Sequence, residues 1–561
     1  MENIIQHWQN HPNLDPQLKE ELKTLSSEQL KDAFFQAVPF GTAGMRGLLG
    51  VGTNRLNVHT IRKANVAFAK YLLQYPKTIE KGVAIAYDNR YMSKTFALES
   101  AKVLASFNIP SYVFKELRPT PELSFAVRKL GCVGGIVITA SHNPKEYNGY
   151  KIYDENGCQL VPHLMDQVID EINSIEDELE IVVSLNDKQT SLIHWLDVDM
   201  DDAYHQAVLG IQLYPKMDKS NIKLVFSPQH GTAHIGVNTL FNAMKVPFVE
   251  VLEQANPDPA FSNTKSPNPE EKQAYDLAIE YAKKEDADAV LTTDPDADRV
   301  GIVVKHQGEY HLLTGNQTGS IIIEYLLSSL KELNRLPKNG VIFNTVVTSD
   351  LGEKIANHYG VEVEKTLTGF KFIGDKIARY EKTHEKSFIM GYEESYGYLI
   401  ESFVRDKDAL QACVILAEAI SYYKHQGLTL VDVLNQLYQN YGYHLEDQMS
   451  LTLTGEEGVN KIKAILNHFR ESIIEDFAGI KVKSKEDYLK GIKYSESLSS
   501  VLNFPSSDVI KYAFEEGSWL AIRPSGTEPK CKFYFCILGK DFNQANEKYN
   551  AIKQALQTHI A

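Results

Sequence analysis

The chain has 561 residues, of which 43% are hydrophobic, 10% aromatic and 23% charged. This length exceeds what one hydrophobic core can organise, and the ordinary composition argues against extensive disorder. The net charge of −15 disfavours a general nucleic-acid binder, so any anionic ligand must be met by a local group of Lys and Arg side chains.

The cysteines and the N-terminus bear on location. The five cysteines are an odd number without a Cys-x-x-Cys pair, which argues against a disulfide framework or a zinc site. The N-terminus lacks the basic and then apolar pattern of a secretory signal, and no segment has the length and apolarity of a membrane span. We therefore expect a cytoplasmic protein without a membrane or nucleic-acid partner.

The first part of the chain alternates short apolar runs with helical patterns. This rhythm is typical of βαβ units in a mainly parallel sheet covered on both faces. The expected elements, in chain order, are the strand Val83–Tyr87, the helix Ser93–Phe107, the strand Ser111–Phe114, the helix Pro121–Leu130 with Thr120 as its cap, and the strand Gly135–Ala140.

The same rhythm appears twice more, which predicts three α/β units of similar plan. The second unit is expected to contain the strand Lys223–Ser227, the helix Ile235–Met244, the strand Phe248–Leu252, the helix Glu270–Lys284 and the strand Ala289–Thr293. The third is expected to contain the strand Val341–Val346, the helix Ser349–Tyr359, the strand Val361–Thr366, the helix Phe370–Tyr380 and the strand Ser387–Met390.

The last part of the chain has a different pattern and predicts a smaller α+β domain. The polar segment Tyr441–Asp447 precedes it and is taken as the boundary. The expected elements are the strand Met449–Thr454, the helix Gly458–Phe469, the strands Trp519–Arg523 and Lys532–Leu538, and the helix Phe542–His559.

A serine stands in a short loop directly after a buried strand, within Thr139-Ala140-Ser141-His142-Asn143-Pro144. Ligands of open α/β sheets bind beyond the carboxyl ends of strands, so Ser141 is either an exposed nucleophile or part of a polar turn. A hydrolase is disfavoured because no Gly-x-Ser-x-Gly elbow surrounds it, and adjacency does not make His142 its base. A serine that carries a phosphoryl group fits better, since it needs a metal and positive charge.

Three acids follow another buried strand, in Asp294-Pro295-Asp296-Ala297-Asp298-Arg299. Carboxylates at this spacing in an extended loop can converge on one hard cation, whereas a solvated acidic turn is the simpler alternative. An EF-hand would need Gly at position 299 and Glu at 305, where the chain has Arg and Lys. A phosphatase of the Asp-x-Asp-x-Thr type would need Thr in place of Asp298.

Three other loops offer groups for phosphates or sugars. Arg523–Lys530 (RPSGTEPK) has the chemistry of a phosphate-binding loop, although Ser-Gly turns are common. Gly391–Gly397 (GYEESYG) offers acids and hydroxyls to sugar hydroxyls. Phe40–Gly47 places Arg46 in an expected flexible loop, and neither a dinucleotide fingerprint nor a Gly-x-x-x-x-Gly-Lys-Ser/Thr loop occurs.

Four motifs together, TASHNPKEYNGYKIY, DPDADR, GYEESYG and RPSGTEPK, give the chain a family resemblance. In this order, from Ser141 to Lys530, they resemble the α-D-phosphohexomutase superfamily and its bacterial phosphoglucomutases of the four-domain type. The resemblance implies three similar mixed α/β domains plus a C-terminal α+β domain around a central cleft. The implied domains are residues 1–203 with the phosphoserine loop, 204–311 with the metal loop, 312–444 with the sugar loop, and 445–561 with the phosphate loop.

The same resemblance implies a role for individual residues. Ser141 is expected to be the phosphoserine and to complete a Mg²⁺ site, one ion per chain, with Asp294, Asp296 and Asp298. The other expected catalytic residues are Lys151 as general acid/base, His142, Arg46, Arg299 and Lys407. The expected substrate-binding residues are Glu393, Ser395, Thr368, Gly369, Lys371, Arg523, Ser525, Gly526, Thr527 and Lys530.

The implied activity is the interconversion of glucose 1-phosphate and glucose 6-phosphate through glucose 1,6-bisphosphate, by a monomer or weak homo-oligomer. Tyr392 stands where many relatives have glycine, so a phosphopentomutase acting on ribose or deoxyribose 1-phosphate is the main alternative. A sugar phosphatase with an Asp nucleophile is a second alternative, and a catalytically silent sugar-phosphate sensor is a third.

Overall fold

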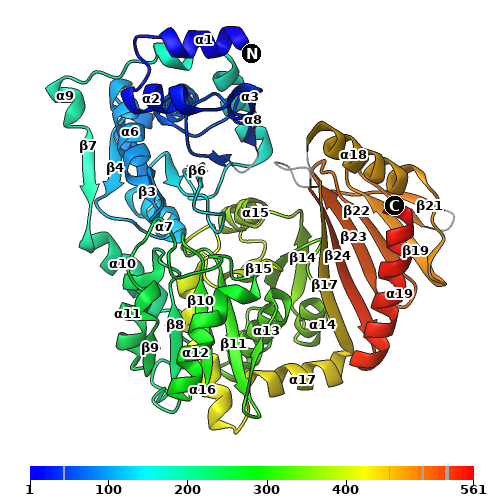
Figure 1. Ribbon diagram of the computed structural model, residues 1–561. Helices are drawn as coiled ribbons and strands as arrows, with labels where there is room; N and C mark the ends of the chain where they lie inside the picture. The colour runs from blue at the N-terminus through cyan, green and yellow to red at the C-terminus, as the bar shows by residue number, and fades with distance from the viewer. Residues whose placement is uncertain (42–43, 454, 496–497, 525–529, 561) are drawn as a thin grey trace. The chain divides into compact units, whose positions relative to one another are not determined.

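The computed structural model describes residues 1–41, 44–453, 455–495, 498–524 and 530–560. The chain divides into two compact units (Figure 1). The first consists of Met1–Thr318 and Phe370–Thr429, and the second of Gly319–Gly369 and Leu430–Ala561.

Three short helices open the first unit. They are α1 (Glu2–Asn10), α2 (Pro16–Thr24) and α3 (Ser27–Phe34). The side chain of Asp15 caps α2, and a capping box at Ser26 begins α3. Trp8 of α1 is buried in a small core that also contains Phe34 and, from much later in the chain, Leu179. The N-terminal helices are thereby packed onto the segment near residue 179.

A seven-stranded sheet in the described part of the first unit carries the Ser141 loop. Its order is β1-β2-β6-β5-β3-β4-β7. The strands are β1 (Phe40–Gly41), β2 (Gly44–Leu48), β3 (Val83–Tyr87), β4 (Ser111–Phe114), β5 (Gly134–Ile138), β6 (Tyr147–Asp154) and β7 (Ile193–Leu196). The accompanying helices are α4 (Val58–Leu72), α5 (Thr78–Lys81), α6 (Ser93–Ser106), α7 (Thr120–Leu130), α8 (Pro162–Asn173), η1 (Glu178–Glu180), α9 (Asp187–Thr190) and α10 (Val198–Leu209).

A second sheet in the same unit carries the acidic loop, with the order β12-β11-β10-β8-β9. Its strands are β8 (Leu224–Ser227), β9 (Phe248–Glu250), β10 (Ala289–Thr293), β11 (Val300–His306) and β12 (Glu309–Leu312), with helices α11 (Ala233–Met244), η2 (Leu252–Gln254), η3 (Lys272–Tyr275) and α12 (Asp276–Glu285). The unit ends with α15 (Phe370–Thr383), the antiparallel strands β15 (Ser387–Glu393) and β16 (Gly397–Leu399), and the buried helix α16 (Ala409–His425).

The second unit combines a parallel strand pair with a large antiparallel sheet. The pair is β13 (Gly340–Thr345) and β14 (Glu362–Thr366), with helices α14 (Leu351–His358) and α17 (Leu430–Tyr441). The helix α13 (Gly315–Glu332) begins in the first unit and continues here. The sheet contains β17 (Tyr443–Thr452), β19 (Ile480–Asp487), β20 (Ile492–Ser495), β21 (Leu498–Val501), β22 (Ile510–Phe514), β23 (Trp519–Pro524) and β24 (Lys530–Gly539), while β18 (Asp476–Phe477) pairs with β19. Helices α18 (Gly455–Glu471) and α19 (Phe542–Ile560) pack into its core.

Most of the expected strands and helices are present within a few residues, but several expectations were wrong. The first sheet is mixed rather than mainly parallel, because β6 and β2 run antiparallel to their neighbours. Arg46 lies in the strand β2, not in a flexible loop, since β6 supplies a ladder partner. The helix expected from Glu270 begins at Asp276 after the 3₁₀ turn η3, and the strand β17 begins inside the polar segment taken as a boundary.

In the part of the chain that the structure describes, no helix combines the length and the apolarity needed to cross a membrane. All five cysteines are free and buried.

Candidate phosphoryl-transfer site

Ser141 lies in the loop after β5 and is held in a fixed conformation. Its backbone has the unusual φ of 51°, and its N–H donates to Oγ1 of Thr139 at 2.8 Å. The side chain is buried, with its hydroxyl donating to Oδ2 of Asp294 at 2.7 Å. Backbone in this left-handed region persists in a non-glycine residue only when its surroundings enforce it. The loop therefore holds the Ser141 hydroxyl against the acidic loop.

Asp294, Asp296 and Asp298 converge in the loop after β10 and are all buried. One carboxylate oxygen from each lies within 4.8 Å of the others. Oδ1 of Asp294 accepts the backbone N–H groups of Asp298 and Arg299, which closes the loop around it. Oδ1 of Asp296 and Oδ1 of Asp298 have no hydrogen-bond partner, although both atoms are buried. Such an oxygen set, with two unpartnered atoms, fits a hard divalent cation.

Two lysines face these carboxylates. Nζ of Lys151, on β6, lies 2.9 Å from Oδ2 of Asp296 and 3.7 Å from Oδ2 of Asp298. Nζ of Lys407, in the segment before α16, lies 3.1 Å from Oδ2 of Asp298. A Cβ at Gly397 would come within 2.0 Å of the Lys407 side chain, so the glycine at this position lets Lys407 reach the acids.

The electrostatics of this cluster are strongly coupled. Burial and then its charged neighbours Asp296 and Asp298 raise the pKa of Asp294 well above its usual value. Burial also acts to raise the pKa of Asp296, but the Lys151 ammonium and hydrogen bonds outweigh it and lower that pKa. Burial opposes the charge of Lys151, yet Asp296 and Asp298 raise its pKa. The Ser141 hydroxyl therefore donates to an acid whose pKa is raised by burial and by its acidic neighbours.

Two arginines and a neutral histidine lie at the Ser141 loop. Arg46 donates to Oδ1 of Asn143 at 2.9 Å, and His142 Nδ1 lies 3.1 Å from the Ser141 hydroxyl oxygen. Burial, followed by Arg299 and Arg46, lowers the pKa of His142 well below its usual value, so its imidazole is neutral. Arg299 is held by Glu270 at 2.5 Å.

Arg90 supports this loop and was missed by the sequence interpretation. Its guanidinium donates to the carbonyl oxygens of Ser141 and Asn143, both at 2.5 Å, and to those of Pro144 and Tyr147. The side chain is buried and also pairs with Asp88 at 3.2 Å. Nothing in the local pattern around Arg90 indicated this, because all four carbonyls lie more than fifty residues away.

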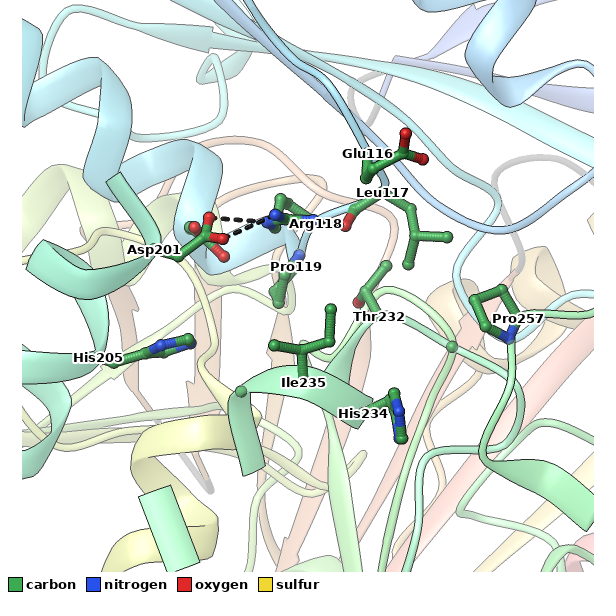
Figure 2. Close-up of a pocket in the computed structure, with 13 residues that line it drawn as sticks. Glu116, Leu117, Arg118, Pro119, Asp201, His205, Thr232, His234, Ile235 and Pro257 are labelled. Atoms are coloured by element: carbon green, nitrogen blue, oxygen red, sulfur yellow. Dashed lines mark hydrogen bonds and ion pairs between the residues drawn. The ribbon is translucent and has the colours of Figure 1, made fainter. Parts of the chain in front are cut away.

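Thr120 was expected to cap α7 but instead supports the acidic loop. The N-cap of α7 is Pro119, without a side-chain cap. The Thr120 hydroxyl donates to Oδ2 of Asp296 at 2.9 Å, so it is not available to the helix. Arg118 anchors this helix start through two hydrogen bonds of 2.7 Å to Asp201 beside a pocket (Figure 2).

Of the residues expected to bind the sugar, Glu393 lies near the charged groups described above. Glu393 is buried at the end of β15. Burial acts to lower the pKa of Arg299 and of Lys407, but nearby acids outweigh it and raise both: Glu270 and Asp298 act most on Arg299, Asp298 and Asp406 act most on Lys407, and Glu393 adds to each. Ser395 lies in the turn between β15 and β16 and is partly exposed. Lys371, on α15, is buried with its ammonium 5.4 Å from the centre of the Phe372 ring.

The other expected substrate-binding residues belong to the second unit. Thr368 and Gly369 precede α15, Arg523 lies on β23, and Lys530 begins β24. Ser525, Gly526 and Thr527 lie outside the described residues. The structure therefore brings together the expected serine, the three acids, and Lys151 and Lys407.

Comparison with known proteins identifies the family. Four family models of phosphoglucomutase/phosphomannomutase match the chain: α/β/α domain I at residues 37–179, domain II at 202–308, domain III at 314–441 and the C-terminal domain at 471–535. The chain belongs to this family. It is 38% identical over 549 residues to a phosphoglucomutase of Staphylococcus aureus strain MSSA476, covering 97% of both chains, and 37% identical to that of strain N315.

Solved structures agree on the fold. A phosphoglucomutase/phosphomannomutase family protein from Burkholderia thailandensis has a TM-score of 0.67 at 18% identity, covering 94% of this chain and 98% of its own. The Paramecium phosphoglucomutase parafusin, in its open form, has a TM-score of 0.67 at 20% identity, covering 93% of this chain and 94% of its own. The four-domain α/β architecture expected from the motifs is thus confirmed.

Proposed function

We propose that this enzyme interconverts glucose 1-phosphate and glucose 6-phosphate through a phosphorylated Ser141. The observation that carries the proposal is the 2.7 Å hydrogen bond from the Ser141 hydroxyl to Asp294, in a loop whose three acids could hold a divalent cation. The relatives named phosphoglucomutase support glucose as the sugar. A serine in this setting can accept a phosphoryl group and return it without releasing it to water.

The proposed reaction consists of two transfers. In the first, the bond between phosphorus and Ser141 Oγ breaks as the free sugar hydroxyl forms a bond to the same phosphorus, which gives glucose 1,6-bisphosphate. Lys151, as an uncharged amine, takes the proton of that hydroxyl and becomes an ammonium beside Asp296 and Asp298, while Ser141 Oγ keeps its negative charge until the second transfer. In the second, the other phosphoryl group returns to Ser141, and Lys151 gives its proton to the sugar oxygen that leaves. Both transfers conserve phosphate, so no net hydrolysis occurs.

The charged side chains have separate tasks in this scheme. Asp294, Asp296 and Asp298 would hold Mg²⁺, which supplies charge withdrawal from the transferring group when bound. Arg46 and Arg299 supply positive charge beside Ser141, and its neighbour His142 contacts the hydroxyl as a neutral group. Lys407, whose Nζ lies 3.1 Å from Oδ2 of Asp298, is the second basic group that the family resemblance places near the sugar.

We also propose the substrate contacts from the family resemblance. Glu393 and Ser395 bind sugar hydroxyls, and Lys371, Thr368 and Gly369 help to distinguish the two orientations of the sugar. The phosphate that does not react binds Arg523, Ser525, Gly526, Thr527 and Lys530. The domain limits 1–203, 204–311, 312–444 and 445–561, a cytoplasmic location and a monomeric or weakly associated state belong to the same proposal.

The pentose alternative rested on Tyr392. This side chain is fully buried on β15, in register with Tyr398 on β16, so it is accommodated inside the fold. The test compares turnover of glucose 1-phosphate and ribose 1-phosphate with Mg²⁺ and a trace of the corresponding bisphosphate. Faster glucose turnover without phosphate release is expected. Faster ribose turnover would move the function to pentose phosphates, and net phosphate release that survives Ser141→Ala would favour the Asp-nucleophile phosphatase.

A further inference from the structure

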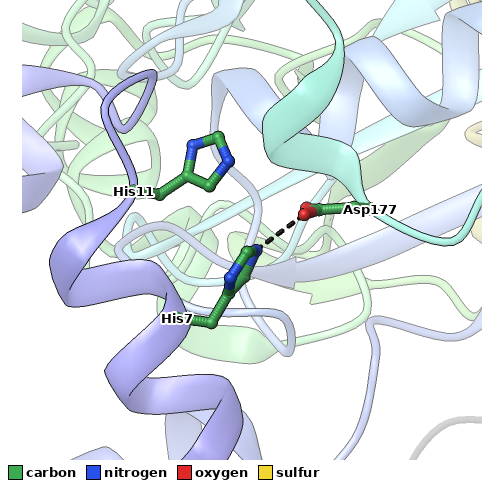
Figure 3. A group of neighbouring side chains, drawn as sticks. All are labelled: His7, His11 and Asp177. Carbon is green, nitrogen blue, oxygen red and sulfur yellow. Dashed lines mark hydrogen bonds and ion pairs between the residues drawn. The ribbon is translucent and has the colours of Figure 1, made fainter.

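A second group of metal-binding side chains lies far from Ser141 in sequence, between the N-terminal helix and the η1 segment. His7 lies on α1, His11 directly follows this helix, and Asp177 precedes η1 (Figure 3). One donor atom from each lies within 4.8 Å of the other two. Nε2 of His7 is 2.6 Å from Oδ2 of Asp177. The mechanism above uses none of these residues.

A fourth donor lies beside this group. Oε1 of Glu180 is 3.0 Å from Nε2 of His11. Two imidazoles and two carboxylates form a nitrogen and oxygen set that suits Zn²⁺ and its neighbours in the first transition series, whereas Mg²⁺ and Ca²⁺ prefer oxygen alone. Two histidines four residues apart are the spacing at which one helical turn presents both rings to one ion. The sequence argument against a zinc site considered cysteine ligands only, so it did not detect this group of histidines and carboxylates.

The framework of the group is fixed by the hydrophobic core. His7 and His11 flank Trp8, and Asp177 and Glu180 flank Leu179. Trp8 and Leu179 are both buried in the same small core, so the four donors are carried on two segments that already pack together. A site built on a rigid framework loses little conformational freedom when an ion binds.

Asp177 is also oriented for binding. Its Oδ1 accepts the backbone N–H of Leu179 at 2.9 Å, which leaves Oδ2 directed at His7. Hydrogen bonds of this kind to the second oxygen commonly fix carboxylate ligands of metals. His7 is about half exposed, with a side-chain exposure of 47%, so an ion can reach the group from solvent.

Binding requires a proton rearrangement at His11. Its Nδ1 now accepts the backbone N–H of Asn13 at 3.3 Å, so Nε2 carries the ring proton and donates to Glu180. A metal on Nε2 needs the ring proton to move to Nδ1. The hydrogen bond from the backbone N–H of Asn13 is then lost. This bond is long, and Asn13 is exposed, so a water molecule can accept from the N–H instead.

We propose that His7, His11, Asp177 and Glu180 form a binding site for a divalent transition-metal ion that fastens the N-terminal helix to the η1 segment. Two neutral imidazoles and two carboxylates carry a charge of about −2, which one such ion neutralises. The ion joins segments about 170 residues apart in the chain, as the His7–Asp177 contact shows. Its role is structural and independent of the Mg²⁺ of the proposed reaction.

The test uses untagged, chelator-treated, full-length protein in excess Mg²⁺, titrated with Zn²⁺ by calorimetry and with Co²⁺ by visible absorption. Four proteins are compared: the wild type, His7→Ala, Asp177→Asn and the control His163→Ala. His163 is an exposed histidine on α8 outside the group. Asp177→Asn keeps the oxygen that caps η1 and replaces the metal-facing oxygen by an amide nitrogen, so a folding defect is not expected.

The wild type and His163→Ala are expected to bind one Zn²⁺ more than the other two variants, or to bind it at least about 100-fold more tightly, because a lost ligand outweighs the about 10–100-fold effect of a lost outer hydrogen bond. Zn²⁺ is expected to raise Tm and to slow proteolysis of residues 1–25 only in these two proteins. The intense Co²⁺ absorption of a nitrogen-containing, near-tetrahedral site should follow the same pattern. Equal Zn²⁺ binding and equal Tm shifts in all four proteins would overturn the proposal.

Discussion

Thr120 and Asp296 are joined by two hydrogen bonds across 176 residues of sequence. The backbone N–H of Thr120 donates to the carbonyl oxygen of Asp296 at 2.9 Å, and its hydroxyl donates to Oδ2 at 2.9 Å. Lys151 donates to the same Oδ2, also at 2.9 Å. Both donors use one oxygen of Asp296, which leaves Oδ1 for a cation. The start of α7 thereby orients a candidate metal ligand.

Thr120→Val should weaken Mg²⁺ binding while preserving the fold. The valine keeps the shape and the backbone bond but removes the hydroxyl that orients Asp296. The Mg²⁺ concentration for half-maximal activity is expected to rise about 10–100-fold, as for other outer hydrogen bonds of metal ligands. Thr239→Val, at an exposed position of α11, is the matched control. An unchanged Mg²⁺ requirement in Thr120→Val would contradict the role given to this residue.

Lys151→Met should abolish most of the activity through chemistry rather than stability. The ammonium of Lys151 contacts two of the three acids, and proton transfer by such a group contributes about 10²–10⁴-fold to rate. We expect kcat to fall in that range, and added Mg²⁺ to restore any loss of Tm by neutralising the acids. Lys305→Met, which breaks only a surface ion pair with Asp286, should leave kcat unchanged. A Lys151→Met enzyme with more than a tenth of the wild-type kcat would rule out this role.

Arg90→Lys should destabilise the Ser141 loop. A lysine cannot reach all four carbonyl oxygens that the buried guanidinium now satisfies, and each buried acceptor left without a partner costs about 1–3 kcal/mol. We expect the free energy of unfolding to fall by about 2–3 kcal/mol, and phosphoryl transfer to slow because Ser141 loses its fixed position. Denaturant unfolding and kcat measure the two effects. The control is Arg379→Lys, at an exposed ion pair with Glu385. If Arg90→Lys is as stable as this control, the Ser141 loop does not depend on Arg90.

His59→Gln should change the acid sensitivity of the first unit. His59 is buried, and its Nε2 accepts the backbone N–H of Asp15 at 3.1 Å. Burial, followed by the charge of Arg62, lowers its pKa to about 4 from 6.5. Because the folded-state pKa is depressed, the neutral ring stabilises the fold fully above pH 6.5, and this contribution is lost as pH falls from about 6.5 to 4.

The expected loss from His59 is about 3 kcal/mol over this interval, at 1.36 kcal/mol per pKa unit. The Gln variant offers an oxygen to the same N–H and does not titrate, so its stability should fall less steeply with pH. Denaturant unfolding of both proteins between pH 4 and pH 7 measures the difference. Parallel stability curves would show that His59 does not titrate with this shift.

The sequence allowed the elements that carry Ser141 and the acids to be predicted because β5 (GGIVI) and β10 (AVLTT) are short, uncharged segments rich in apolar and β-branched residues, as expected of buried strands. Their loops stand at strand ends, where ligand-binding residues gather. The three acids were predicted as a possible cation site from their spacing after a buried strand, and Lys151 was expected from the family motifs; the structure shows that Lys151 contacts two of the acids. The proximity of Ser141 and Lys151 to the three acids could not be derived from sequence spacing, since it depends on how two separate sheets pack.

The roles of Thr120 and Arg90 were not predictable for the same reason. A threonine before a proline reads as a helix cap, and only the tertiary partner Asp296 shows that its hydroxyl is used elsewhere. The strand β17 was placed too late because its first half is polar and four of its ten residues are exposed. Arg46 was placed in a loop because the five-residue strand β2 is ordered by its pairing with β6 rather than by its own composition.

The most direct test of the central claim is the phosphorylation of Ser141 itself. Wild-type enzyme and the Ser141→Ala variant are incubated with Mg²⁺ and glucose 1,6-bisphosphate, and the phosphoryl group is located by intact-mass and peptide mass spectrometry. We predict one phosphoryl group per wild-type chain, on Ser141, that is transferred to added glucose 1-phosphate, and none on the variant, which should also lack mutase activity. A variant that keeps its mutase activity, or a wild-type phosphoryl group on Asp294 instead of Ser141, would contradict the phosphoserine mechanism.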